Sequence, residues 1–113
     1  MLGKARIMTA EVEIAVLTAA FTARPDRVGE LAAVLARYVV LTRGEAGCRN
    51  VDLLTSATES EKFVVIEKWE TPEDARSHLD TELMTAMAAA AVPLLAEQPK
   101  IDLLDTISAH DLD

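Results

Sequence analysis

The chain of 113 residues contains one cysteine, Cys48, and only 4% of its residues are aromatic. A single cysteine excludes an intrachain disulfide and a zinc site built from several cysteines. The sequence also lacks the roughly 20 consecutive apolar residues that a transmembrane helix needs. Its first residues do not combine a charged start with an apolar signal core. We therefore expect a cytoplasmic protein.

Basic residues are in the minority, because eleven lysines and arginines stand against nineteen aspartates and glutamates. Nucleic acids and anionic membrane surfaces are bound through clustered Lys and Arg side chains. The formal net charge of −8 thus argues against both kinds of partner. Half of the residues are apolar, which is typical of a globular chain. The length leaves room for one hydrophobic core, in one domain or in half of a symmetric dimer.

The spacing of the apolar residues predicts strands and helices in a regular order. Strands are expected at 12–22, 48–56, 63–70 and 101–107, where residues alternate or run apolar. Apolar residues three and four apart predict a helix from about Pro25 to about Arg43. A second helical region begins at Pro72 behind the cap candidate Thr71, breaks near 80–81 and continues over 82–97 with a kink at Pro93.

This order predicts an α+β fold of the ferredoxin-like βαββαβ type, with a four-stranded antiparallel sheet and helices on one face. Its strands are apolar on both faces, so the face without helices requires a cover. A second copy of the same sheet would provide it, and we therefore expect a homodimer. The domain is expected at 12–107, between a flexible N-terminal arm at 1–11 and a polar C-terminal tail at 108–113.

The segment from Phe63 to His78 carries the residues that are most informative about function. Strand alternation places Glu67 and Trp69 on one face. An ionised carboxylate resists burial without a partner. Either Glu67 lies near a sheet edge, or it is paired inside a cleft. The helix that follows presents His78, one of two histidines, in its second turn.

Two groups of residues form a pattern together with Asn50. They are Arg43-Gly44-Glu45-Ala46-Gly47-Cys48 and Glu67-Lys68-Trp69 with the following helix from Ala75 to His78. The pattern resembles the antibiotic biosynthesis monooxygenase (ABM) domain family, through its Glu-x-Gly-Cys turn and its Glu-x-Trp strand followed by an Ala-x-x-His helix. The similarity extends from about Val12 to about Ile107.

The resemblance implies a dimeric α/β barrel in which each subunit holds a pocket between its sheet and its helices. In several members this pocket oxygenates phenols, quinols or anthrones with molecular oxygen, without metal, flavin or haem. No cofactor or metal is therefore expected. Related haem-degrading members bind iron through a histidine in the last helix, and residues 84–92 contain none.

Under this resemblance the candidate catalytic residues are His78, Trp69 and Asn50. A histidine accepts protons near neutral pH, an indole supplies an apolar wall, and the amide can bind a substrate oxygen. The candidate substrate-binding residues are Glu67, Arg43, Phe63, Met84 and Met87. Glu67 can orient His78 or pair with Arg43.

Each candidate also has a purely structural interpretation. Trp69 can be part of the core, His78 can pair with Glu67 for packing, and Asn50 can be a satisfied strand residue. Glu67 can form a salt bridge with an arginine, Arg43 or Arg49. Cys48 fits a small buried apolar residue, and Tyr38 fits packing on the first helix.

Two functions follow from these interpretations. The first is a cofactor-independent monooxygenase that oxidises a quinol or polycyclic phenol with molecular oxygen. The alternative is a non-catalytic dimeric protein of the same fold that binds a small molecule. A pocket filled by its own side chains, which leaves only a dimer scaffold, is the third possibility.

Overall fold

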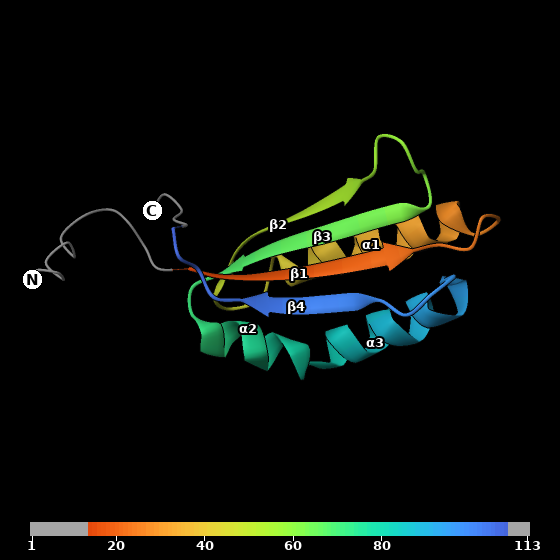
Figure 1. Cartoon of the computed structure of the whole chain (residues 1–113). Helices are drawn as coiled ribbons and strands as arrows, with labels where there is room; N and C mark the ends of the chain where they lie inside the picture. The colour runs from red at the N-terminus through yellow and green to blue at the C-terminus, as the bar shows by residue number, and fades with distance from the viewer. Residues whose placement is uncertain (1–13, 109–113) are drawn as a thin grey trace, which may run out of the picture.

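Four strands form one antiparallel sheet in the order β2-β3-β1-β4, as the computed structural model of residues 14–108 describes it (Figure 1). The strands are β1 (Ala15–Thr22), β2 (Cys48–Thr55), β3 (Lys62–Trp69) and β4 (Lys100–Leu104). The helices are α1 (Val28–Thr42), α2 (Pro72–Leu79), α3 (Glu82–Ala91) and the short 3-10 helix η2 (Val92–Leu94). The predicted ferredoxin-like α+β fold is confirmed.

The last helix ends earlier than predicted, at Ala91 instead of 97. Pro93 has no N–H to donate, and its ring clashes with the preceding turn of an α-helix. The chain therefore tightens into η2 and becomes extended at Leu95. The last strand also stops early, because β4 pairs with β1 only as far as Leu104 opposite Val16, close to the start of β1. The predicted arm at 1–11 and most of the tail at 108–113 lie outside the described residues.

The start of α2 follows the predicted capping pattern. The side chain of Thr71 accepts a hydrogen bond of 3.0 Å from the backbone N–H of Asp74, and Pro72 occupies the first helical position. Thr81 caps α3 in the same way, through the N–H of Met84 at 3.2 Å. The predicted break near 80–81 is thus a cap, which separates α2 from α3.

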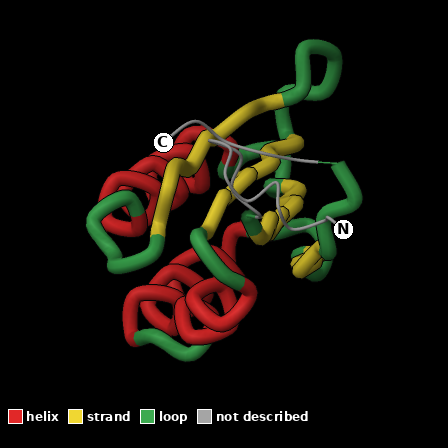
Figure 2. The backbone as a smooth tube through the Cα atoms, turned by 90° about the vertical axis from the view of Figure 1, so that its left-hand side faces the viewer, coloured by secondary structure: helices red, strands yellow, loops and turns green. Residues whose placement is uncertain are grey.

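The hydrophobic core lies between the helices and one face of the sheet, and Figure 2 shows the helices to one side of the strands. Alternate residues of the central strands point into it, and α1 and α3 cover them. Buried members of this core include Ala19, Phe21, Phe63 and Val65 from the sheet, Leu31, Leu35 and Val39 from α1, and Met84, Met87 and Ala91 from α3.

The opposite face of the sheet has no helix on it. Strand register places Val16, Val64 and Ile66 on this face, all partly buried, together with two exposed leucines. Leu54 and Leu104 remain 47% and 44% exposed. Among the described residues, no helix is long and apolar enough to cross a membrane.

Candidate functional site

Glu67 is fully buried in the middle of the sheet, because β3 lies between β2 and β1. Of the two alternatives for this carboxylate, the structure shows pairing in the interior. Trp69, two residues along the same face of β3, donates its indole N–H to Oε1 of Glu67 at 2.9 Å. The hydroxyl of Tyr38, from α1, lies 2.5 Å from Oε2. Both carboxylate oxygens thus have a hydrogen-bond partner.

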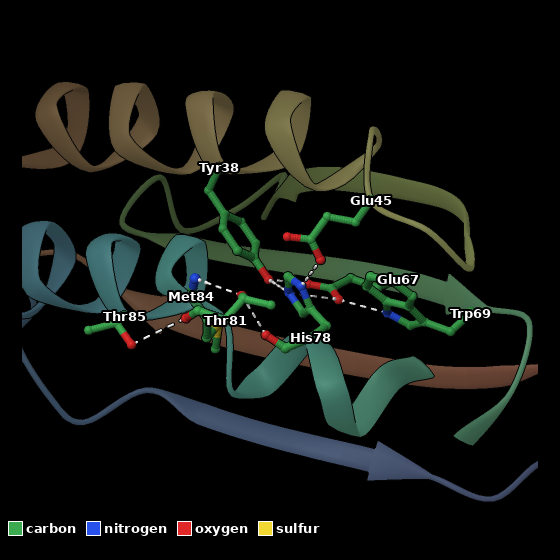
Figure 3. A network of polar contacts seen from close by, with 8 residues as sticks. All are labelled: Tyr38, Glu45, Glu67, Trp69, His78, Thr81, Met84 and Thr85. Atoms are coloured by element: carbon green, nitrogen blue, oxygen red, sulfur yellow. Dashed lines mark hydrogen bonds and ion pairs between the residues drawn. The ribbon is translucent and has the colours of Figure 1, made fainter. Parts of the chain in front are cut away.

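His78 is equally enclosed, with 1% of its surface exposed, and both ring nitrogens have close partners (Figure 3). Nε2 lies 2.6 Å from the Tyr38 hydroxyl and 3.6 Å from Oε1 of Glu67. Nδ1 lies 2.7 Å from Oε1 of Glu45. The ring also packs on the Trp69 indole, with ring centroids 4.8 Å apart at an angle of 32°.

We call Tyr38, Glu45, Glu67, Trp69 and His78 the buried network. Its members come from α1, from the turn after α1, from β3 and from α2. Within residues 14–108, no group of three or more His, Cys, Asp and Glu side chains is arranged to hold a metal ion.

The turn after α1 is held against the start of α2, and this contact brings Glu45 to His78. Gly47 has a φ of 84°, a conformation that side chains strongly disfavour. A Cβ atom at this position would lie 2.5 Å from Cγ of Asp74 in α2. The Gly47 carbonyl accepts a hydrogen bond of 2.8 Å from the N–H of Glu70. Only glycine fits this close approach.

Burial raises the pKa of the Tyr38 phenol far above its ordinary value, and the charge and hydrogen bond of Glu67 raise it further. Tyr38 is therefore neutral at physiological pH. Burial also raises the pKa of the Cys48 thiol to about 11, with smaller contributions from the charges of Glu67 and Glu45. The thiol is protonated at neutral pH, which supports the interpretation of Cys48 as a small packing residue and not a nucleophile.

A cavity of about 200 Å³ lies between α1 and α3. Its lining is mainly apolar and consists of Val34, Arg37, Tyr38, Leu41, Leu83, Ala86, Met87 and Ala90. Tyr38 is the one residue that belongs to both this lining and the buried network. The volume of the cavity is below the 300–1,000 Å³ that is roughly typical of ligand pockets, so the cavity favours a small ligand.

The predicted site residues divide into two groups in the structure. Glu67, Trp69 and His78 come together in the buried network, and Met87 lines the cavity. Their functional roles stay predictions, but their proximity is a finding.

The other four predicted residues lie apart from the network. Arg43 donates from Nη2 and Nε to the carbonyl of Val51, at 2.9 and 3.2 Å, and so ties the turn to β2 instead of pairing with Glu67. Asn50 follows a β-bulge and pairs with Lys68, on the sheet face away from the helices. Phe63 and Met84 are buried in the hydrophobic core.

Two members of the network were not among the predicted site residues. The sequence pattern predicts only a packing role for Tyr38, although a buried tyrosine hydroxyl on the apolar stripe of a helix usually needs a partner. Glu45 stands out in the sequence only as part of the turn motif. Neither contact can be read from local spacing, because Tyr38 and Glu45 lie 40 and 33 residues from His78.

The family model for antibiotic biosynthesis monooxygenase (ABM) matches residues 14–90. The chain belongs to the ABM family. No curated protein sequence matches it. The buried network is thus a feature of an ABM domain. It forms where the predicted Glu-x-Trp strand and Ala-x-x-His helix meet.

Solved structures support the ABM fold. The chain is similar to Rv0793 from Mycobacterium tuberculosis, with a TM-score of 0.78 and 26% identity over 85% of this chain and 97% of that one. It is similar to PA3566 from Pseudomonas aeruginosa, with a TM-score of 0.75 and 30% identity over 85% and 96% of the two chains. A structure described as an antibiotic biosynthesis monooxygenase has a TM-score of 0.76 and 21% identity over 83% and 99%.

Proposed function

We propose that this ABM domain is a cofactor-independent monooxygenase that oxidises a quinol or polycyclic phenol with molecular oxygen. The observation that supports the proposal best is the position of Tyr38. Its side chain lines the cavity between α1 and α3, and its hydroxyl contacts both His78 and Glu67. A substrate in the cavity would therefore meet the buried network at this residue. The small volume of the cavity favours a single-ring quinol over a polycyclic phenol.

The reaction requires the substrate to lose a proton before it reduces oxygen. A phenolate is electron-rich enough to pass electrons to O₂, so the protein has to position it and accept its proton. One oxygen atom then enters the ring and the other leaves as water, with all four electrons supplied by the substrate. Because both nitrogens of His78 are occupied, the proton would enter the network at Tyr38 and reach His78 from there.

The uncovered sheet face supports the expectation of a homodimer, and we propose that a second copy packs on it. Val64 and Ile66 lie at its centre, in a central strand, and Leu54 and Leu104 flank them. Light scattering should give twice the mass of one chain. Ile66→Lys should give a folded monomer, and a monomeric wild-type protein would contradict the proposal.

The function is tested by oxygen uptake of purified, chelator-treated protein against a panel of single-ring quinols, anthrones and larger phenols. The wild-type protein should consume oxygen with at least one of them. Tyr38→Phe, which keeps the ring and removes the hydroxyl, should lose most of this rate. Val40→Ala is the control, because Val40 is 63% exposed on the same helix and belongs neither to the cavity lining nor to the buried network. Equal rates in the wild-type protein and Tyr38→Phe would show that the site is wrong.

The complete enclosure of Glu67 and His78 favours the alternative function, a small-molecule-binding protein without catalysis. In that case the network only stabilises the wall of the cavity. Calorimetry would then show saturable binding of a small apolar ligand, with no oxygen uptake at any pH.

A further inference from the structure

The buried network contains three very short contacts in series. Tyr38 Oη lies 2.5 Å from Glu67 Oε2 and 2.6 Å from His78 Nε2, and His78 Nδ1 lies 2.7 Å from Glu45 Oε1. Two lone pairs repel each other at such distances, so each contact needs one hydrogen between its two atoms. The three contacts together need three hydrogens.

The ordinary charge states of these groups supply only two. Tyr38 brings one hydrogen, and a neutral imidazole brings one. Ionised Glu67 and Glu45 bring none. The indole N–H of Trp69 already fills its own contact with Glu67 and does not change the count. The geometry therefore requires one additional proton.

This additional proton has three possible positions. On His78, the imidazolium donates to Tyr38 and to Glu45, and Tyr38 donates to Glu67. On Glu67, the carboxylic acid donates to Tyr38, Tyr38 donates to Nε2, and Nδ1–H donates to Glu45. On Glu45, the carboxylic acid donates to Nδ1, Nε2–H donates to Tyr38, and Tyr38 donates to Glu67. The three arrangements have the same protons and the same net charge of about −1, and they differ only by shifts along hydrogen bonds.

We propose that Glu67, Tyr38, His78 and Glu45 form a proton relay that stores one proton and exchanges it with water at Glu45. The side chains of Glu67 and His78 are 0% exposed, whereas that of Glu45 is 24% exposed. Glu45 is therefore the end of the relay that water can reach. Burial of Tyr38 fits its place in the middle, because a phenol with a strongly raised pKa gives up one proton only as it receives another.

The titratable and charged groups that face this relay come from every element around it. They are Tyr38 from α1, Glu45 from the turn, Cys48 from β2, Glu67 from β3 and His78 from α2. The use of the relay in turnover rests on the function proposed above: the stored proton would leave at Glu45 as a substrate hydroxyl gives its proton to Tyr38. The stored proton itself does not depend on that function.

The variant Glu45→Gln should remove the stored proton while it keeps the three contacts and the fold. The amide of Gln can donate to Nδ1 of His78, so that Nε2–H donates to Tyr38 and Tyr38 donates to ionised Glu67. All three contacts are then filled without an additional proton, and the variant can neither store it nor release it. Glu73→Gln makes the same change of charge at an exposed position in the first turn of α2 and is the matched control.

Nuclear magnetic resonance at pH 7 counts the protons directly. The ¹⁵N shifts of the His78 ring and the ¹³C shifts of the Glu45 and Glu67 carboxyl carbons report their protonation, and His110→Gln removes the other histidine signal. The wild-type protein and Glu73→Gln should hold one proton beyond a neutral imidazole and two carboxylates. Glu45→Gln should show a neutral ring with its proton on Nε2. A neutral ring and two ionised carboxylates in the wild-type protein would overturn the relay, whatever the oxygen assay shows.

Oxygen uptake tests the role in turnover. In dilute buffer, Glu45→Gln should be at least about tenfold slower than the wild-type protein, and its rate should recover as a small buffer base is added. A purely structural role of Glu45 would not make the rate depend on buffer. Equal rates for both proteins at every buffer concentration would overturn the role in turnover. If the wild-type protein consumes no oxygen, the proposed function fails, and the proton count alone decides the relay.

Discussion

The hydroxyl of Tyr38 lies 2.5 Å from Oε2 of Glu67, across 29 residues of sequence. This contact joins the C-terminal part of α1 to the middle of the sheet, and it allows a carboxylate to lie in the hydrophobic interior. Removal of the hydroxyl in Tyr38→Phe would leave Glu67 and His78 each without one partner. We expect a loss of about 2 kcal/mol or more in the free energy of unfolding.

Urea denaturation of the wild-type protein and Tyr38→Phe measures this difference. Val40→Ala, which shortens a side chain that is 63% exposed on the same helix, should change stability by less than about 0.5 kcal/mol. An unchanged stability of Tyr38→Phe would mean that water replaces the missing hydroxyl.

Tyr38 is the only tyrosine, so its titration can be followed by the ultraviolet absorbance of phenolate. Its pKa is higher in the folded chain than in the unfolded chain. The stability linked to this group is therefore fully present below the unfolded pKa near 10 and is lost as the pH rises above it. We expect phenolate absorbance to develop together with the loss of circular dichroism. Phenolate formation in the folded protein below pH 10 would show that the hydroxyl is accessible.

Cys48 should react slowly with iodoacetamide at pH 8. A thiol whose pKa is raised from 9.0 to about 11 contains about a hundredfold less thiolate at this pH. The alkylation rate of the folded protein should continue to rise beyond pH 9, whereas that of the urea-unfolded chain should level off. Mass spectrometry of timed samples measures both rates, and identical pH profiles would contradict the raised pKa.

Gly47→Ala should destabilise the fold by more than about 1 kcal/mol, because φ is 84° and the new Cβ would meet Asp74. Gly29 provides a control of opposite sign. It lies in α1 with no atom within 4 Å of a Cβ, so Gly29→Ala should stabilise the protein by about 0.5 kcal/mol. Thermal unfolding of both variants distinguishes the strained position from the open one.

The sequence was sufficient for the order of elements and for local structure. Thr71 and Pro72 lie next to the backbone that they cap, so the start of α2 could be predicted from adjacent residues alone. The predicted end of α3 is too late, because Pro93 stops the α-helix two residues before its own position instead of only bending it.

The candidate site was predicted only in part. The resemblance to the ABM family and the carboxylate beside an indole in one strand predict Glu67, Trp69 and His78 as site residues. The partners of Glu67 could not be predicted, because they depend on how α1 lies over the sheet. One of the predicted alternatives is an ion pair between Arg43 and Glu67. In the structure the turn directs the guanidinium of Arg43 to the carbonyl of Val51 instead. Tertiary packing decides such contacts.

The members of the buried network come from α1, a turn, β3 and α2, and this origin has a kinetic consequence. Glu67 is surrounded only when all four segments have docked, so its contacts should be absent from the transition state for folding. Tyr38→Phe should then accelerate unfolding in stopped-flow experiments and leave the folding rate nearly unchanged. The lifetime of the folded protein would depend on the same hydroxyl that joins the cavity to the interior.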